Sequence, residues 1–397
     1  MRSRPALLLS AGAALFLLLP AFAQQAAPQT DKLATQESPW WRQITTNGYM
    51  SLSYTNNEND PYPRINQFRV FDFNDNEPQL DAAEIVIQRA AAKRNETGFR
   101  FDLITGSGVP EVTAAYGLFR NCHSGVAHHV DITQFYGRYV VPVGSGLSVD
   151  VGKFSTHMGY EVIGGYDGYN DNFSRSFIFG YGIPFTHTGI RTSYTFNSRF
   201  SGMLSMTKGW DDFKNTNSSY SWGAQVAVNT SKTTQFSFNF VHGPERLQNN
   251  HDQRSVGEIV ATWKPTSKLS FAADALYGHE ENGVAAGQDA IWKGIAGYAK
   301  YAFTPQWSFA TRVERFRDGG GTRTGFDQTL TALTLTPEYV RAAKLSSISK
   351  SLKHLDGKVA IRGEFRIDFS DQNVFRKGPD PRSDRQPTAA VNLIYLF

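Results

Sequence analysis

The chain has 397 residues, of which 13% are aromatic and 19% charged, with 35 glycines, a composition that favours one large all-β unit over two or three ordinary soluble domains. The formal net charge is +4, and two of these charges, Arg2 and Arg4, lie in a segment that export would remove, so a nucleic-acid partner is not indicated. A single cysteine, Cys122, excludes an intrachain disulfide.

Residues 1–23 predict a cleaved signal peptide. Arg2 and Arg4 precede an apolar stretch, and the small-x-small pattern of residues 21–23 stands just before Gln24. Beyond residue 23 no segment has the about 18 consecutive apolar residues of a membrane helix, which excludes helical membrane spans. Residues 24–43 are small, polar and proline-containing and predict a flexible periplasmic lead-in, which leaves 44–397 as one domain.

From Thr45 onward apolar and polar residues alternate, as they do in β-strands. The alternation is clearest in 359–370, where apolar residues take one face and charged residues the other. It recurs in 99–103, 147–151, 236–240 and 269–277. A tilted strand needs about ten residues to cross a bilayer, and 269–277 and 359–370 are about that long. A soluble sandwich can alternate in the same way.

The connections between the predicted strands alternate between short and long. Short turns at 142–146, 197–198, 230–232, 264–268 and 304–305 separate long loops near 57–77, 107–130, 156–184, 210–218, 243–254, 279–290, 317–326 and 370–386. Connections that alternate in this way place the short turns on one rim and the long loops on the other. This is typical of a transmembrane antiparallel up-and-down β-barrel with short periplasmic turns and long extracellular loops. The segments predict about 16 strands, an even number.

The basic connection at 340–356 is long where a short turn is due. Either it is a periplasmic insertion or the strand count is wrong there.

The chain ends in an alternating strand, TAAVNLIYLF. Phe397, Tyr395 and Leu393 share one face, a pattern that resembles the signal read by the barrel-assembly machinery. We therefore expect the last strand to close the barrel.

Several segments together resemble the OmpL-like family of β-barrel porins. The GKF-THMG and SRS--FGY-IPF-HTG stretches are the most specific, and the full set is 47–57, 69–89, 98–103, 142–163, 172–194, 208–212, 261–271 and 317–325. The resemblance implies an outer-membrane barrel with porin activity and no defined substrate. The chain departs from the family at 340–356 and at the histidine-containing 121–129.

If the apolar faces contact lipid, charged residues on the opposite faces line a pore and tune its ion selectivity. An alternative is that they pair across the inner wall. The predicted set holds six basic and six acidic residues, which predicts no strong preference for cations or anions: Arg100, Asp102, Arg138, Asp150, Arg191, Asp274, Arg312, Glu314, Arg362, Glu364, Arg366 and Asp368.

A sixteen-stranded barrel is wide enough for an aqueous channel, so we expect a segment to narrow it. The glycine-rich loop 156–184 is the candidate for folding into the lumen and setting its carboxylates against wall arginines, which would create a transverse field. Its predicted constriction residues are His157, Glu161, Asp167, Asp171 and Arg175.

These expectations describe a porin for passive diffusion of small hydrophilic solutes, or alternatively a non-channel barrel that acts in adhesion or surface recognition through its long loops. The expected partners are outer-membrane lipid, the barrel-assembly machinery, the solutes and, by analogy of fold, copies of the chain in a homotrimer.

No catalytic motif supports an enzyme. Ser155 with His157, or Ser174 with His187, could be pieces of a lipase site, but no motif fixes either arrangement. No cofactor is implied. No metal is assigned either, because adjacent histidines at 128–129 point apart on an extended segment.

Overall fold

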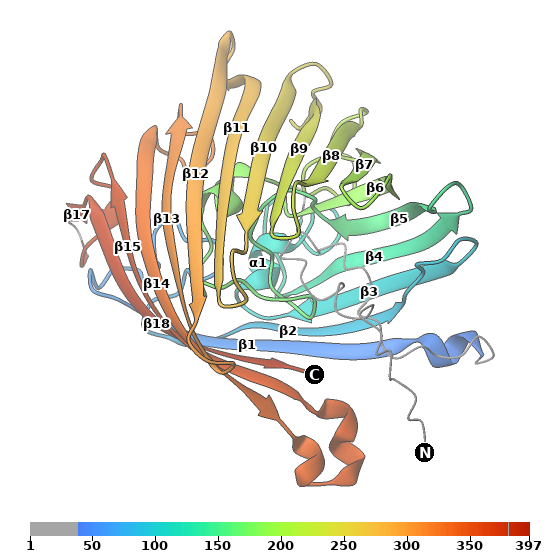
Figure 1. The fold of residues 1–397 in the computed structure, drawn as a ribbon. Coiled ribbons are helices and arrows are strands. Elements are labelled where there is room, and N and C mark those ends of the chain that lie inside the picture. Colours follow the sequence, from blue (N-terminus) through green and yellow to red (C-terminus); the bar gives the residue numbers. More distant parts are fainter. Residues whose placement is uncertain (1–38, 122, 380) are drawn as a thin grey trace, which may run out of the picture.

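The computed structural model describes residues 39–121, 123–379 and 381–397, and its strands close into an antiparallel barrel of sixteen (Figure 1). The strands are β1 (Thr45–Asn57), β2 (Pro78–Arg89), β3 (Thr97–Thr105), β4 (Val130–Val141), β5 (Leu147–Ser155), β6 (Thr186–Thr195), β7 (Phe200–Thr207), β8 (Ser221–Asn229), β9 (Thr234–Pro244), β10 (Gln253–Trp263), β11 (Leu269–Ala285), β12 (Gln288–Ala302), β13 (Trp307–Gly319), β14 (Gln328–Ala343), β15 (Gly357–Ser370) and β18 (Arg385–Leu396). The barrel architecture and its strand number, predicted from the sequence, are confirmed.

The remaining elements lie in the connections. They are η2 (Trp40–Gln43), α1 (Val109–Thr113), η3 (Ile178–Gly182), η4 (Leu345–Ser347), η5 (Lys350–Leu355) and the small hairpin of β16 (Phe375–Arg376) and β17 (Arg382–Ser383). None of the helices among the described residues is long and apolar enough to cross a membrane.

The barrel closes where β1 pairs with β18. Beyond the last pair, the backbone N–H of Gly48 donates to the Phe397 carbonyl at 2.9 Å, and the N–H of Phe397 donates back to Gly48 at 3.0 Å. The Phe397 ring occupies the space above Gly48, where an added Cβ would lie 2.1 Å from a ring carbon. Glycine at this position therefore lets the terminal aromatic ring pack on the seam.

Burial alternates along the strands as a lipid-exposed wall requires. On β15 the side chains of Arg362, Glu364 and Arg366 are buried, whereas Ile361 is 47% and Phe365 61% exposed. The apolar outer face and the charged inner face of this strand follow from the two-residue repeat of extended backbone.

One predicted loop is wrong. Instead of a long connection at 279–290, β11 and β12 continue above the neighbouring strands and pair up to Ala285 and Gln288 (Figure 1). This sequence is polar and glycine-containing, and an extended hairpin outside the lipid has no need of apolar side chains on one face. Alternation of polarity therefore gave no signal there.

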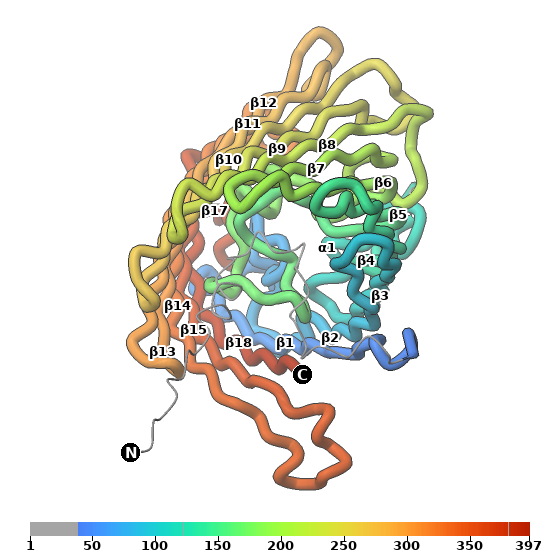
Figure 2. The backbone as a smooth tube through the Cα atoms, turned by 45° about the vertical axis from the view of Figure 1, so that its right-hand side comes forward, coloured from blue at the N-terminus to red at the C-terminus, as the bar shows by residue number. Residues whose placement is uncertain are grey.

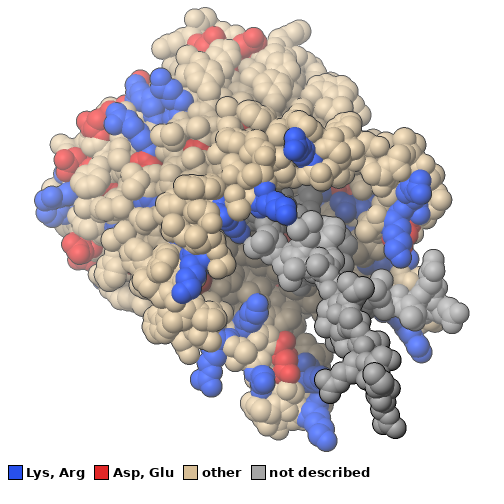
Figure 3. Space-filling view, in the orientation of Figure 1, with Lys and Arg blue, Asp and Glu red and all other residues tan. Residues whose placement is uncertain are grey.

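The basic connection predicted at 340–356 is an insertion, and the strand count holds. β14 and β15 are joined by residues 344–356, which carry η4 and η5 and project from the rim that holds the short turns (Figures 1 and 2). Several lysine or arginine side chains lie on this projection (Figure 3). Its base is closed by Ser346, whose backbone N–H donates to Asp356 at 2.7 Å.

The predicted signal peptide, residues 1–23, and most of the predicted lead-in lie outside the described residues. Residues 39–43 are described, and they include the 3-10 helix η2 directly before β1.

An apolar cluster lies inside the barrel. Phe177, Phe179 and Ile183 from the connection between β5 and β6 pack with Phe71 from the first loop and Trp292 from β12. An inner wall that carries Trp292 and other buried apolar residues is not lined by water alone, so a segment of the chain must cover it.

Candidate pore interior

Residues 156–185, the connection between β5 and β6, cross the space that the strands enclose (Figure 2). The segment contacts strands on all sides of the barrel. The side chain of Gln225 on β8 donates to the His157 carbonyl at 2.9 Å, and Asp167 pairs with Arg100 on β3 at 2.6 Å. The crossing segment, as we call residues 156–185, therefore spans the lumen.

Wall carboxylates hold the crossing segment by accepting hydrogen bonds from its backbone. Glu364 accepts from the N–H groups of Phe173 and Ser174 at 2.6 and 3.0 Å. The other bonds of this kind run from Gly159 to Glu258 at 2.8 Å, from Tyr160 to Asp274 at 2.9 Å, from Tyr166 to Glu84 at 2.7 Å and from Phe177 to Glu314 at 2.5 Å. Charge-assisted bonds of this type are roughly twice as strong as neutral ones.

Wall arginines hold the same segment through its carbonyl groups. Arg312 donates to the Ser174 carbonyl at 2.6 Å, and Arg366 donates to the Arg175 carbonyl at 2.6 Å. Arg362 donates to the Asn170 carbonyl at 2.5 Å. All three arginines were predicted to line a pore, and all three are buried against the crossing segment.

Three of the predicted constriction residues form ion pairs with the wall. Glu161 lies 2.7 Å from Arg312, Asp167 lies 2.6 Å from Arg100, and Asp171 lies 2.7 Å from a lysine, Lys300.

The other two predicted constriction residues contact neutral groups. Arg175 donates to the carbonyls of Val162 and Phe173 and so ties two arms of the segment together. His157 shares a hydrogen bond with the Phe240 carbonyl at 3.2 Å. Burial lowers the pKa of His157 to about 3, so its imidazole is neutral near pH 7.

The tip of the crossing segment, residues 162–170, is a closed lobe. The side chain of Asn170 accepts from the Val162 N–H and donates to the Val162 carbonyl, both at 2.7 Å. Gly165 and Gly168 form an antiparallel β-bridge with each other, which closes the far end of the lobe. A Cβ on Gly165 would lie 2.4 Å from a carboxylate oxygen of Glu84, so glycine is needed for the tip to approach β2.

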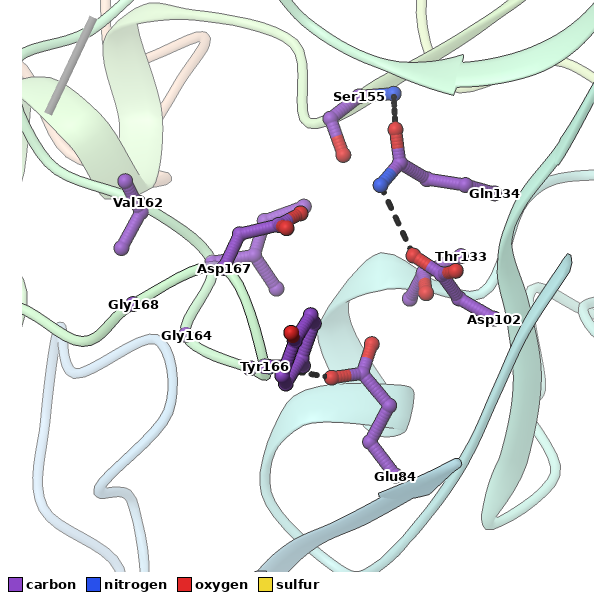
Figure 4. Close-up of a pocket in the computed structure, with 12 residues that line it drawn as sticks. Glu84, Asp102, Thr133, Gln134, Ser155, Val162, Gly164, Tyr166, Asp167 and Gly168 are labelled. Carbon is purple, nitrogen blue, oxygen red and sulfur yellow. Dashed lines mark hydrogen bonds between the residues drawn. The ribbon is translucent and has the colours of Figure 1, made fainter. Parts of the chain in front are cut away.

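A cavity of ≈ 30 Å³ separates the tip from β2–β5. Glu84, Asp102 and Asp167 point toward it (Figure 4), and Thr133, Gln134 and Ser155 complete the wall side. The Gln134 amide orients this wall, because it donates to Asp102 at 2.8 Å while its oxygen accepts from the Ser155 N–H at 3.2 Å. A space of this size holds one or two water molecules.

Some predicted pore-lining residues pair across the wall, which was the alternative interpretation. Asp150 on β5 lies 2.6 Å from Arg138 on β4 and 2.8 Å from Arg191 on β6. Arg366 and Asp368, 2.6 Å apart, pair within one strand, β15. No hydrogen bond to the crossing segment is seen for Arg138 among the described residues, so its ion pair serves the wall itself.

Sequence reasoning missed several charged residues of the interior. Glu84, Glu258 and Lys300 contact the crossing segment but were not in the predicted set. Glu258 is flanked on its own face by Val256 and Val260, both fully buried, so no polar face marked it. On β10 the inner face beside Glu258 is apolar, so the alternation there shows no charged stripe.

The serine and histidine residues considered for a lipase site have other partners. Ser174 receives a hydrogen bond from Arg312 at 3.2 Å, and His187 lies 3.2 Å from the Thr156 hydroxyl. Within the described ranges, no group of three or more His, Cys, Asp or Glu side chains is arranged to hold a metal ion.

Solved structures with a similar fold are outer-membrane channels of low sequence identity. The outer membrane channel DcaP of Acinetobacter baumannii is 8% identical with a TM-score of 0.56, covering 89% of this chain and 97% of that one. An anion-selective porin from Comamonas acidovorans is 9% identical with a TM-score of 0.56, covering 89% and 99%. OmpF of Salmonella typhi, in complex with daunomycin, is 13% identical with a TM-score of 0.54, covering 89% and 97%.

No curated protein matches the sequence. A family model does: the family described as "Putative beta-barrel porin-2, OmpL-like" matches residues 43–397, which include every strand of the barrel. The chain belongs to this family of outer-membrane β-barrel porins.

Proposed function

We propose that the protein is a channel for passive diffusion of small hydrophilic solutes, narrowed by the crossing segment. The observation that carries the proposal is the cavity between the tip and β2–β5, which lies inside a closed barrel and is lined mostly by polar groups. The segment is bonded to the wall on the sides of β10, β11, β13 and β15 and also, at its tip, to Glu84 on β2 and Arg100 on β3. The cavity lies beside these tip contacts, and we propose that solutes pass there.

Beside the residues that pair within the wall, two further roles appear in the predicted pore-lining set. Arg312, Arg362, Arg366 and Glu364 act mainly as anchors of the crossing segment. Asp102, with Arg100 and the tip residue Asp167, faces the path that solutes would take.

Three acidic side chains and one arginine surround this gap, so we propose a modest preference for cations, in contrast to the even balance of the whole predicted set.

Single-channel conductance in planar bilayers tests the constriction. Deleting residues 164–171 removes most of the tip, and the bond between Val162 and Asn170 shows that the two ends of the deleted stretch lie close together. We expect a higher conductance. A matched control deletes 347–355 from the periplasmic projection, whose ends are joined at Ser346 and Asp356, and should leave conductance unchanged. Equal conductance of the tip deletion and the unmodified protein would refute the constriction.

Liposome swelling tests the channel itself and separates it from the adhesion alternative. Vesicles that contain the protein should take up small sugars faster than empty vesicles, and the tip deletion should extend uptake to larger sugars. Vesicles that stay tight with both proteins would favour a barrel that works through its loops.

A homotrimer is proposed by analogy with a solved trimer form of OmpT from Vibrio cholerae, which shares the fold.

A further inference from the structure

The outer surface of the barrel carries a cluster of basic residues where lipid is expected. Lys293 on β12 lies between Ile291 and Ile295, which are 40% and 56% exposed, whereas the adjacent Trp292 is fully buried in the interior. Because successive side chains of a strand point to opposite faces, Lys293 faces the lipid. It is itself exposed.

Arg315 and Arg317 on β13 occupy the same outer face. Glu314 and Phe316 on either side of Arg315 are buried, and Val313 on the outer face is 56% exposed. The strand register places Arg317 directly opposite Lys293, and Arg315 opposite Ile295. Arg315 is therefore the diagonal neighbour of Lys293, a separation of about 7–8 Å between their Cα atoms. Figure 3 shows lysine and arginine side chains near the upper ends of β12 and β13.

The height of the cluster matches the outer boundary of the membrane. β13 begins on the periplasmic side at Trp307, whose ring lies 4.8 Å from that of Tyr339 and marks the aromatic girdle there. Arg315 stands eight residues further on, which is roughly 26 Å along the strand and roughly 20 Å along the membrane normal at a tilt of about 40°. Arg317 lies near the edge of the apolar band, which is about 25 Å tall.

Two of the three cations have no partner in the described part of the chain. Arg317 forms an ion pair with Asp327 in the adjoining loop. Neither Arg315 nor Lys293 has an ion pair or hydrogen bond there. A lone guanidinium in the outer part of the apolar band is unfavourable, so a ligand with the opposite charge would be drawn to it.

The neighbouring strand supplies hydroxyl groups beside the cations. Thr329 and Thr331 on β14 stand opposite Arg317 and Arg315. Guanidinium, ammonium and hydroxyl donors on one surface match the oxygen atoms of a phosphate, which arginine can bind in a bidentate manner. Lipids supply phosphates at this height.

We propose that Lys293, Arg315 and Arg317 form a binding site for the phosphate of a glycolipid in the outer leaflet of the outer membrane. The acyl chains of the lipid would lie along the apolar face below Arg315, where Val313 and Ile295 are exposed. The site is separate from the channel, because the same strands turn Trp292 and Glu314 inward, and it does not depend on solute passage.

The test uses the full-length protein purified in mild detergent, with lipid A that carries two phosphates as the probe and native mass spectrometry as the readout. We expect lipid A to bind the unmodified protein and to bind the Lys293→Gln/Arg315→Gln variant about tenfold or more weakly, since two charge-assisted bonds are lost. The matched control is Arg341→Gln, an exposed arginine on the outer face at the periplasmic end of β14. It should bind lipid A as the unmodified protein does.

Three outcomes would overturn the proposal. One is equal binding of lipid A by the variant, and another is equal binding of lipid A from which both phosphates have been removed. The third is full competition by millimolar inorganic phosphate, which would indicate a site for free anions. A change of oligomeric state in the variant with unchanged lipid binding would assign the cluster to contacts between copies of the chain instead. Heat-modifiability of each variant shows whether the barrel has folded.

Discussion

The crossing segment should come loose from the wall when Arg312 is replaced by methionine. Arg312 is fully buried and lies 2.7 Å from Glu161 of the segment and 3.0 Å from Glu314 of its own strand. It also donates to the Ser174 carbonyl at 2.6 Å. The change Arg312→Met keeps a long apolar side chain and removes all of these bonds.

The magnitude follows from the two carboxylates that are left behind. Removing one partner of a buried ion pair costs about 3–5 kcal/mol, because the other charge stays buried without compensation. Glu314 keeps Arg366 at 3.5 Å, whereas within the described part of the chain Glu161 keeps only hydrogen bonds from Ser176. We therefore expect the lower end, about 3 kcal/mol, which shifts the equilibrium between docked and undocked segment by roughly a hundredfold.

The barrel itself should survive, since the backbone pairing of β13 with β12 and β14 does not involve the Arg312 side chain. Single-channel recordings should then show higher and noisier conductance, and amide hydrogen exchange should become faster in residues 158–177. Arg138→Met is the matched control, because Arg138 pairs with Asp150 within the wall. It should leave both measurements unchanged.

Conductance and exchange that remain as in the unmodified protein would refute the idea that Arg312 holds the segment. A second variant sharpens the test. Adding Glu161→Gln and Glu314→Gln to Arg312→Met removes the uncompensated charges, so docking should largely return. Failure of this rescue would show that the direct bonds of Arg312, rather than the stranded carboxylates, dominate.

Three further predictions concern other parts of the molecule. Asp102→Asn/Asp167→Asn leaves Arg100 without its two carboxylate partners, so the reversal potential should move toward anion preference, and an unmoved potential would place the selective gap elsewhere. Burial raises the pKa of Asp212 to about 7, so the folded protein holds a proton between about pH 4 and 7 that the unfolded chain has lost. The free energy of unfolding should therefore fall as the pH rises through this window, and Asp212→Asn should flatten the slope of the thermal midpoint measured by circular dichroism; equal slopes would contradict this. Gly48→Val should displace the terminal phenylalanine ring and reduce the fraction of heat-modifiable barrel, whereas an unchanged fraction would show that this packing is dispensable.

The sequence predicts the strands well where the interior is polar. On β15 the charged face and the apolar face are both complete, so the two-residue repeat alone orients Arg362 and Phe365. The repeat fails on β12, where Trp292 faces inward and Lys293 faces outward. The polarity of the residues on a strand face follows what that face contacts. On β12 the crossing segment makes the inner face apolar, whereas the outer face is charged near the rim.

The anchoring role of the wall charges could not be read from the sequence. Predicting that Glu364 faces inward requires only its position in the strand, but its acceptance of two backbone N–H groups depends on where the crossing segment runs. That path is set by contacts between residues almost 200 positions apart in the chain. Local periodicity contains no information about such pairs.

Some charged residues of the wall anchor the crossing segment and others line the gap, so they should contribute unequally to ion selectivity. An even count of acidic and basic residues predicts no preference only if every charge acts equally on a passing ion. Arg312 and Glu314 are bonded to each other and shielded by the crossing segment, so their fields largely cancel at the gap. Asp102 and Asp167 line the gap itself. A neutral variant of an anchor should thus change conductance and noise, whereas a neutral variant of a gap residue should change the reversal potential.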